Sequence, residues 1–450
     1  MLFWFMGPPP GGPWTRSLSG PASAGPFFSL GQGRFLSRIP RKAVDFRGFL
    51  PFTPLGGAGP SAIVHAIFQV LNYYDGWVTM KLTIDRAALL RSLSHVQSAV
   101  ERRNTIPILA NVLLRAEDGA LAMTTTDMDL EINESVAATV QAPGATTAPA
   151  HTLHDIIRKM PDGSAIELAV DGSGNTMTVK AGRSTFKLSC LPVGDFPELG
   201  GHDMPVNFAM PAAELRALID RTKFAMSTEE TRYYLNGIYI HAGANGNLKV
   251  LRAVATDGHR LARFEMPLPD GADAMPGVII PRKAVGELRK LLDEAADTIE
   301  IGLSQSKVRF AFDHIVMTSK LVDGTFPNYE QVIPTGNTKV VEVNPKLFSG
   351  AIDRVSTISD GKSRAVKIAL NGKTMTLSAN SPDSGSATED LEVNGNDNME
   401  IGFNARYLMD ITSQISGDGC RMMLADAASP TIIQDTSDPS ALYVLMPLRV

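Results

Sequence analysis

The chain repeats one sequence pattern three times, and this repetition constrains the fold more than any other feature. Each copy opens with a strand-like segment, a turn and an amphipathic helix, and the copies begin at Leu82, Asn207 and Val341. Alternating apolar and polar runs follow, separated by Asp-Gly or Asn-Gly, which are typical of β-hairpins. A second amphipathic helix and further strands close each copy. The repetition therefore predicts an α+β protein of three similar domains.

The repeats also fix the expected boundaries and the buried faces of the helices. The predicted segments are an N-terminal extension over 1–79 and domains over 80–204, 205–337 and 338–450. Apolar residues recur at helical spacing in the first helix of each copy, so one stripe of each helix is expected to face the core. The expected stripes are Leu89, Leu93, Val96 and Val100, then Leu215, Leu218, Ile219 and Thr222, then Leu347, Ala351, Ile352 and Val355.

The first 79 residues lack the repeat. They hold 14 of the 30 aromatic residues, and they carry six Lys or Arg against two acidic residues. Such a Pro/Gly-rich segment is not expected to fold alone. It could be a targeting peptide, a functional tail, or upstream sequence included through an early start codon. We favour the third interpretation because a regular pattern begins at Met80.

Composition narrows the class of protein. No run of about 18 apolar residues occurs, so no membrane span and no membrane partner are expected. Cys190 and Cys420 offer neither a disulfide framework nor zinc spacing, which fits a reducing cytoplasm.

The net charge is −5, but the six repeat helices hold 14 basic and six acidic residues. Solvated helix faces would explain this excess. Helices sharing one surface would instead make a basic stripe suited to DNA phosphates.

No catalytic motif stands out. The sequence has no Walker loop, no HExxH and no nucleophile elbow, so we expect neither catalysis nor a cofactor or metal. Asp257 and His259 could in principle perform acid–base chemistry, although their Asp-Gly pair is also an ordinary hairpin turn. An enzyme on a repeated α+β scaffold and a transcription regulator reading DNA with a helix-turn-helix remain alternatives.

Six segments carry a resemblance to a known family. They are TIPILAN (105–111), RYYLNG (232–237), VATDGHRLA (254–262), FPNYEQVIP (326–334), EIGFNARYL (400–408) and YVLMPLRV (443–450). In this order and spacing they resemble the bacterial DNA polymerase III beta subunit family, the sliding clamps. The resemblance covers 80–450, and nothing in 1–79 matches.

The resemblance implies a head-to-tail homodimer that closes into a ring, with helices lining the hole and sheets outside. The ring would slide on duplex DNA without reading its sequence. It would tether the DNA polymerase III alpha subunit, other polymerases and repair proteins through short peptides, and a separate clamp loader would open it. The expected location is the cytoplasm, at the nucleoid.

The resemblance also assigns site residues. The matches to the partner-peptide pocket are Leu235, Thr256, Gly258, His259, Arg260, Leu261, Pro327, Val332, Asn404, Tyr407, Val444, Leu445, Met446, Pro447, Leu448 and Arg449. Among these, arginine and asparagine at the rim are expected to hold the peptide backbone or a glutamine. The matches to DNA contacts are Arg103, Tyr233 and Tyr234, and those to the dimer seam are Phe186, Leu188 and Ile358.

The charge distribution adds further DNA-contact candidates on the helices. They are Arg158, Lys159, Arg216, Arg221, Arg282, Lys283, Arg289 and Lys290. The chain departs from the family pattern at Gln331, Ser363 and Pro430 in the pocket, and at Thr228 and Glu229 near the DNA contacts. An acid at Glu229 would weaken a phosphate contact.

Overall fold

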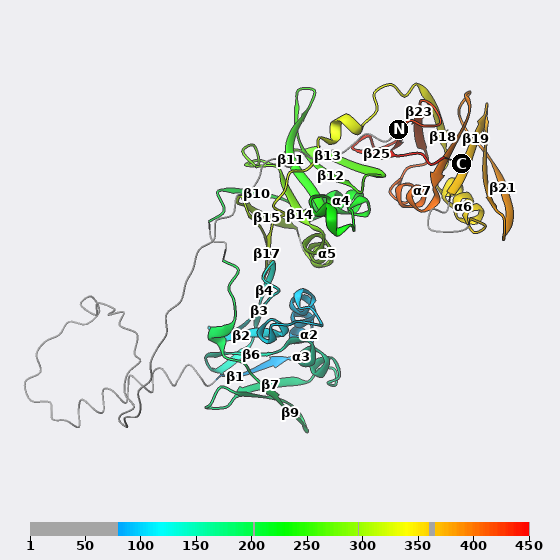
Figure 1. Ribbon diagram of the computed structural model, residues 1–450. Helices are drawn as coiled ribbons and strands as arrows, with labels where there is room; N and C mark the ends of the chain where they lie inside the picture. The colour runs from blue at the N-terminus through cyan, green and yellow to red at the C-terminus, as the bar shows by residue number, and fades with distance from the viewer. Residues whose placement is uncertain (1–79, 201–202, 296, 360–364, 450) are drawn as a thin grey trace, which may run out of the picture. The chain divides into compact units, whose positions relative to one another are not determined.

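The computed structural model describes residues 80–200, 203–295, 297–359 and 365–449 (Figure 1). The expected N-terminal extension and Ser363 lie outside these residues. No described helix is long and apolar enough to cross a membrane.

The described part of each repeat contains two α-helices and eight or nine strands. The first has β1 (Lys81–Asp85), α2 (Arg86–Val96), β2 (Asn111–Glu117), β3 (Ala120–Thr126), β4 (Leu130–Ala137), β5 (Thr139–Ala142), β6 (Gly144–Pro149), α3 (Ala150–Arg158), β7 (Ala165–Val170), β8 (Thr176–Ala181) and β9 (Ser184–Ser189). The second has β10 (Val206–Pro211), α4 (Ala212–Thr222), β11 (Gly237–Asn245), β12 (Leu248–Thr256), β13 (Arg260–Pro267), β14 (Val278–Pro281), α5 (Arg282–Leu291), β15 (Thr298–Leu303), β16 (Lys307–Phe312) and β17 (Ile315–Lys320). The third has β18 (Lys339–Val343), α6 (Pro345–Ser356), β19 (Ala365–Asn371), β20 (Thr374–Ser381), β21 (Gly385–Glu392), β22 (Asn398–Asn404), α7 (Ala405–Thr412), β23 (Cys420–Leu424), β24 (Thr431–Asp435) and β25 (Ala441–Leu445). The predicted α+β class is confirmed.

Three of the described helices, α2, α6 and α7, begin at a side-chain cap. The first helix of each repeat buries its expected face with one exception. The side chain of Asn344 accepts hydrogen bonds from two backbone amides at the start of α6, as capping requires. Leu347 was expected in the core but is 61% exposed, whereas Phe348 is fully buried. This expectation was wrong because the buried stripe of α6 begins at Phe348 and continues three, four and seven residues later.

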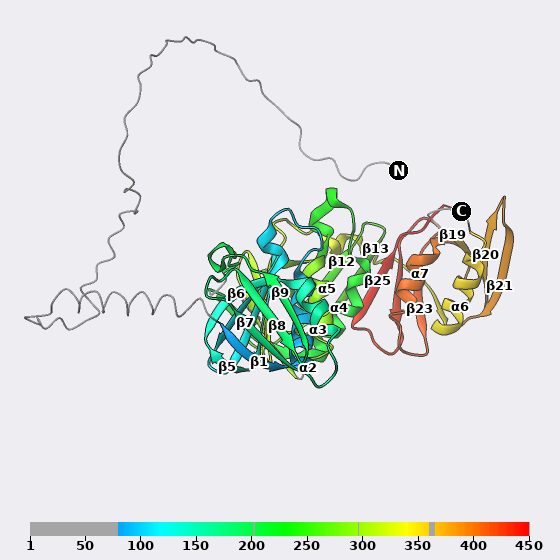
Figure 2. The same cartoon turned by 90° about the horizontal axis from the view of Figure 1, so that it is seen from below.

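The described strands form four sheets, two of which join neighbouring repeats. One eight-stranded sheet has the order β10-β15-β16-β17-β4-β3-β2-β6, and the other has the order β14-β11-β12-β13-β25-β24-β23-β18. The repeats therefore meet at β17–β4 (Figure 1) and again at β13–β25 (Figure 2). Leu261 pairs with Val444 at the second of these junctions. The other two sheets have the orders β5-β1-β7-β8-β9 and β21-β20-β19-β22, so β9 and β21 each end a sheet.

The turn before each joining strand is built alike in the first and second repeats. In the first, the Met128 amide donates to Thr126 Oγ1 at 2.9 Å, and Asp127 Oδ1 accepts from the next two amides. The same bonds recur over 256–260. The central residue has a positive φ in both, +77° at Met128 and +88° at Gly258. Glycine suits this conformation, whereas a residue with a Cβ is strained.

Met128→Gly is expected to stabilise the protein, because it relieves this strain. The gain is about 0.5–1 kcal/mol, since the flexibility of glycine in the unfolded chain offsets part of it. Denaturant unfolding of the two proteins measures it. Gly119→Ala is the matched control, because Gly119 has φ +76° and a Cβ there would lie 4.0 Å from its nearest neighbour. Gly119→Ala should lower the stability of the folded protein by a similar amount. A destabilised Met128→Gly would contradict the strain.

A buried ion cluster joins the first two repeats. His95 on α2 is 9% exposed. Its Nδ1 lies 2.8 Å from Glu134 Oε2 on β4, and its Nε2 lies 3.2 Å from Glu294 Oε1 after α5. Ser92 donates to Glu134, and Arg91 donates to Glu294. Two ionised carboxylates require two N–H donors, so the geometry indicates the imidazolium form.

The stability of this junction is therefore expected to depend on pH. Burial alone would lower the pKa of His95, but the hydrogen bonds and charges of Glu134 and Glu294 outweigh it and raise that pKa above 6.5. Because the pKa of His95 is higher in the folded than in the unfolded chain, its ion pairs stabilise the protein fully below pH 6.5. This stabilisation is lost as pH rises through the pKa of His95 in the folded protein. The difference in melting temperature between wild type and His95→Gln should therefore shrink as the pH is raised over this range. The exposed His314 gives the control, His314→Gln. A pH-independent difference would contradict the charged bridge.

Candidate functional site

The second junction brings most of the predicted pocket residues together. Leu235 and Leu261 from the second repeat share one buried apolar cluster with Val444 from the third. The segment after β25 is bonded to both repeats, since the Met446 amide donates to His259 O at 2.9 Å and the Leu448 amide donates to Gly402 O at 2.8 Å. Strand pairing at β13–β25 and these two bonds hold the segment beside the turn over 256–260.

Apolar side chains remain accessible at this junction. Val332, which ends the short 3₁₀ helix η7 (Tyr329–Val332), is 37% exposed, and Met446 is 38% exposed. Pro327, Tyr407 and Leu448 are half-buried. Such exposed aliphatic and methionine side chains can accept leucine or aromatic anchors from a peptide.

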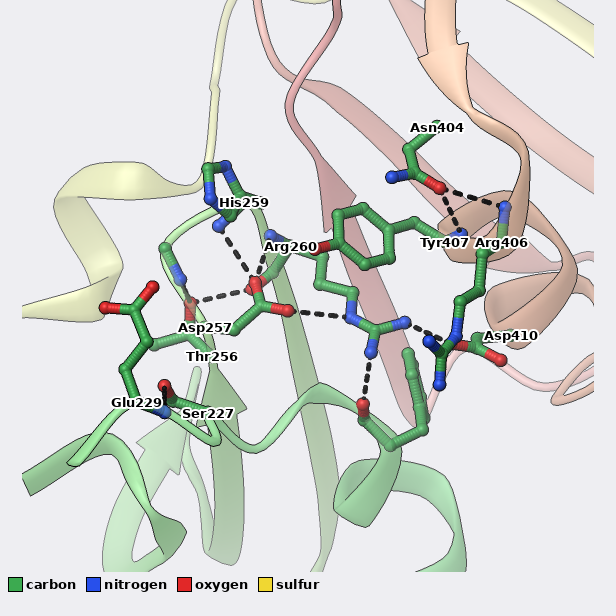
Figure 3. Close-up of polar contacts among 12 residues, drawn as sticks. Ser227, Glu229, Thr256, Asp257, His259, Arg260, Asn404, Arg406, Tyr407 and Asp410 are labelled. Carbon is green, nitrogen blue, oxygen red and sulfur yellow. Dashed lines mark hydrogen bonds and ion pairs between the residues drawn. The ribbon is translucent and has the colours of Figure 1, made fainter. Parts of the chain in front are cut away.

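The two arginines of the predicted pocket set differ: Arg449 is exposed, whereas the side chain of Arg260 is buried and its nitrogens are occupied (Figure 3). Nε donates to Asp257 Oδ2 at 3.1 Å, Nη1 donates to Asp410 Oδ2 at 2.5 Å, and Nη2 donates to Phe224 O at 2.5 Å. The guanidinium carbon lies 4.3 Å from the ring centroid of Tyr407 and 5.2 Å from that of Phe224. Arg260 therefore bonds within the protein rather than presenting donors outward.

Neighbouring polar residues shape the same surface. The exposed His259 stacks on Tyr407 with ring centroids 6.3 Å apart. Asn404 Oδ1 accepts from the Arg406 and Tyr407 amides and so caps α7, leaving its amide nitrogen as the group that could serve a peptide. Burial raises the pKa of Tyr407, which keeps the phenol neutral.

Four residues of this site were missed from the sequence: Phe224, Arg232, Asp257 and Asp410. Arg232 packs on the turn, and a Cβ at Gly258 would lie 2.6 Å from Arg232 Nη1. Arg232 and Asp257 lie inside the matched motifs, and Asp410 follows Tyr407 by one helical turn. The sequence thus held a signal for these three, but none for Phe224.

The departures from the family pattern also have places in the structure. Gln331 is exposed on η7. The Pro430 carbonyl accepts from Asn337 Nδ2 at 2.9 Å. Glu229 lies 2.7 Å from Arg232, and the hydrogen bond from Arg232 lowers the pKa of Glu229. The acid at this position is therefore paired with a neighbouring cation.

The predicted DNA-contact residues differ in how accessible their charges are. Arg103 is exposed, and Tyr233 on the 3₁₀ helix η6 (Glu230–Leu235) is 54% exposed beside the half-buried Tyr234. Lys159 and Arg282 are also exposed, and the exposed Arg158 lies 3.3 Å from Asp155. The remaining candidates bond to carboxylates: Arg216 to Asp293, Arg221 to Asp438, Lys283 to Asp127 and Glu101, Arg289 to Asp220 and Asp293, and Lys290 to Glu287.

The three predicted seam residues differ in how far their side chains are exposed. Phe186 on β9 is 38% exposed. Leu188, two residues further, is buried within the core of its own repeat. Ile358 follows α6 and is half-buried. Phe186 is therefore the seam candidate whose side chain contributes least to the interior of one chain.

Comparisons with known proteins agree over the whole repeated region. Family models for the DNA polymerase III beta subunit match its N-terminal domain at residues 80–200, its central domain at 209–328 and its C-terminal domain at 330–449. The beta sliding clamp of Caulobacter vibrioides is 51% identical over 372 residues, covering 82% of this chain and 100% of the relative. The beta sliding clamp of Escherichia coli is 39% identical over 375 residues, with the same coverage.

Solved structures that resemble this chain are also beta sliding clamps. A crystal structure of the Caulobacter crescentus beta sliding clamp aligns with a TM-score of 0.80 at 51% identity, covering 83% of this chain and 100% of that one. A sliding clamp from Bartonella birtlesii, bound to griselimycin, aligns with the same score, identity and coverage. With three matching domains in order and relatives matched along their full length, this chain belongs to the DNA polymerase III beta subunit family, the beta sliding clamps.

Proposed function

We propose that two copies of this chain close into a ring around duplex DNA and act as the sliding clamp of replication. Membership of the beta sliding clamp family supports this function. The observation that carries the ring is that β9 and β21 each end a sheet at the position where, at the other repeat ends, strands pair between repeats. The proposed domains are 80–204, 205–337 and 338–450, with 1–79 outside the ring-forming part.

The sheet topology supports the dimer. Within the chain, neighbouring repeats join by pairing edge strands into eight-stranded sheets. Strands β9 and β21 are the corresponding edges of the first and third repeats, and an unpaired edge is a template for pairing with another chain. Arg183 and Lys187 lie at or beside β9, whereas Asp390 and Glu392 are exposed on β21. Opposite charges favour β9 of one copy against β21 of the second, and two such contacts close a two-fold ring.

The partner site is the groove at the second junction, which takes clamp-binding peptides of the polymerase alpha subunit, the clamp loader and repair proteins. Its exposed apolar side chains and the backbone-bonded segment after β25 support this assignment. The griselimycin-bound relatives show that proteins of this family take compounds of that name. The clamp would work in the cytoplasm, at the nucleoid.

The protein needs no catalysis for this role. Asp257, the candidate acid or base, accepts two backbone amides and the Arg260 side chain, so its carboxylate shapes the turn. Among the described residues, no group of His, Cys, Asp and Glu side chains could hold a metal ion.

Retention on DNA tests the function. The clamp is loaded on a primed circular plasmid by its loader and separated from free protein by gel filtration. A sliding ring should stay with the circle and leave once a restriction enzyme linearises it. A sequence-specific regulator would remain bound to its site after cutting, and that result would overturn the proposal.

Arg103, Lys159 and Arg282 are expected to supply phosphate contacts, because they are exposed and make no ion pair with a described carboxylate. Replacing all three with Ala should weaken DNA binding at low salt and reduce the slope of log K against log salt by roughly 0.9 for each phosphate that is no longer neutralised. Titration of labelled duplex at several salt concentrations measures this. Lys373→Ala, in the β19–β20 hairpin, is the control. An unchanged slope in the triple variant would contradict the assignment.

A further inference from the structure

The structure assigns Asp410 as a positioning residue for the partner-peptide groove: through its ion pair with Arg260, it fixes the ring of Tyr407 and the turn that carries His259. This inference rests on the proposed partner site and deepens it. Its starting point is the pair of contacts that Arg260 makes, one across the junction and one within its own repeat. Nη1 donates to Asp410 in the third repeat, and Nη2 donates to the Phe224 carbonyl in the second.

The arginine of this ion pair is buried, and the pair lies next to groove residues. The Arg260 side chain is 9% exposed and that of Asp410 is 33% exposed. The guanidinium packs on the ring of Tyr407, whose other close neighbour is the exposed His259 ring (Figure 3). Asp410 thus contacts Arg260, Arg260 contacts Tyr407, and Tyr407 contacts His259. Loss of the Asp410 charge would leave a buried guanidinium short of a partner, which is costly.

The first junction serves as an internal comparison, because its backbone is built in the same way. There the Lys320 amide donates to Asp129 O at 2.8 Å, and the Val322 amide donates to Ile279 O at 3.0 Å. These bonds correspond to those of Met446 and Leu448 at the second junction.

The side chains at the two junctions differ at the position of Arg260. At the first junction this position is Leu130, which is 2% exposed and pairs with Ser319 on β17, as Arg260 pairs with Leu445 on β25. A junction of this kind therefore forms without a buried arginine. The arginine and its aspartate occur at the junction that carries the apolar groove, which supports a role in binding rather than in joining repeats.

The test measures binding of a fluorescein-labelled peptide containing Gln-Leu-Ser-Leu-Phe to the full-length chain by anisotropy. Asp410→Asn should raise the Kd about tenfold, because loss of one charge-assisted hydrogen bond releases the ring of Tyr407. Arg260→Gln should have a similar effect, and the double variant should bind no more weakly than either single variant. Asp410→Glu, which keeps the charge, should recover part of the affinity.

Asp438→Asn is the matched control. Asp438 pairs with Arg221 at 3.6 Å, also between the second and third repeats, but Arg221 does not pack on Tyr407. Its removal should leave peptide affinity unchanged, with melting temperatures recorded for every variant. Unchanged affinity in Asp410→Asn, additive losses in the double variant, or an equal loss in Asp438→Asn would each overturn the role of Asp410. A wild-type chain that fails to bind the peptide would overturn the groove, and with it this role.

Discussion

The Phe186→Asp variant is expected to be a monomer at concentrations where the wild-type chain is a dimer. In the proposed ring, β9 pairs with β21 of a second copy, and Phe186, now 38% exposed, would become buried. An unpaired carboxylate buried at each of the two contacts costs about 3 kcal/mol, about 6 kcal/mol for the ring, which raises the dimer dissociation constant by roughly 10,000-fold. Sedimentation velocity over a dilution series measures the change, and the variant should also fail to remain on circular DNA.

The choice of Phe186 keeps this test separate from folding. Leu188, the neighbouring seam candidate, is buried in the core of its own repeat, so Leu188→Asp would also damage the monomer. An exposed apolar residue away from the two edges, Leu248 at 72% exposure in the β11–β12 hairpin, gives the control variant Leu248→Asp. A dimer of unchanged stability in Phe186→Asp, or a monomeric wild type at all concentrations, would contradict the proposed ring.

Met446→Asp is expected to weaken peptide binding strongly while leaving the dimer folded. Met446 is 38% exposed in the groove, and its backbone amide, which the substitution retains, anchors the segment to His259. A charge placed against an incoming leucine or phenylalanine removes an apolar interaction and desolvates a carboxylate. The combined cost of about 3 kcal/mol corresponds to a loss of roughly 100-fold in affinity.

Anisotropy of the same labelled peptide measures the effect, and Leu248→Asp again serves as the control because it places the same charge on a distant hairpin. Deletion of residues 446–450 should give the same loss, with a small fall in melting temperature because the two backbone hydrogen bonds of this segment are removed. Equal affinity in the wild-type, Met446→Asp and truncated proteins would show that the partner site lies elsewhere.

Local sequence signals predicted the elements well where periodicity and turns act over short distances. The three strand–turn–helix openings, the second helices and the Asp-Gly and Asn-Gly hairpins followed from spacing alone, and the α+β class is confirmed. The stripe of α6 was assigned one residue too early, at Leu347 rather than Phe348. Both residues are apolar, and only packing against β19, β20 and β21 decides which of them is buried.

Counting charges along the sequence was a weaker guide to the DNA-contact residues than periodicity was to the helices and strands. The helices do carry more basic than acidic residues, but a count of them does not reveal which cations pair with carboxylates. Lys283 bonds to Glu101 and Asp127, which lie more than 150 positions away. Arg221 likewise bonds across the second junction. Such interactions depend on how the repeats join, so a count along the sequence overstates the charge that is available for DNA.

The sequence by itself determined the threefold repeat, its elements and the motifs that identify the family, because helix and strand periods and turn chemistry are local. The tertiary structure alone decided which strands remain as open edges, and that the two repeat junctions share one backbone design. It also decided that Arg260 is a buried group bonded within the protein, whereas Arg449 is exposed. The physical reason is that burial and ion pairing are set by residues distant in sequence. Phe224 meets Arg260 through packing within the second repeat, and Asp410 becomes its neighbour only when β13 pairs with β25.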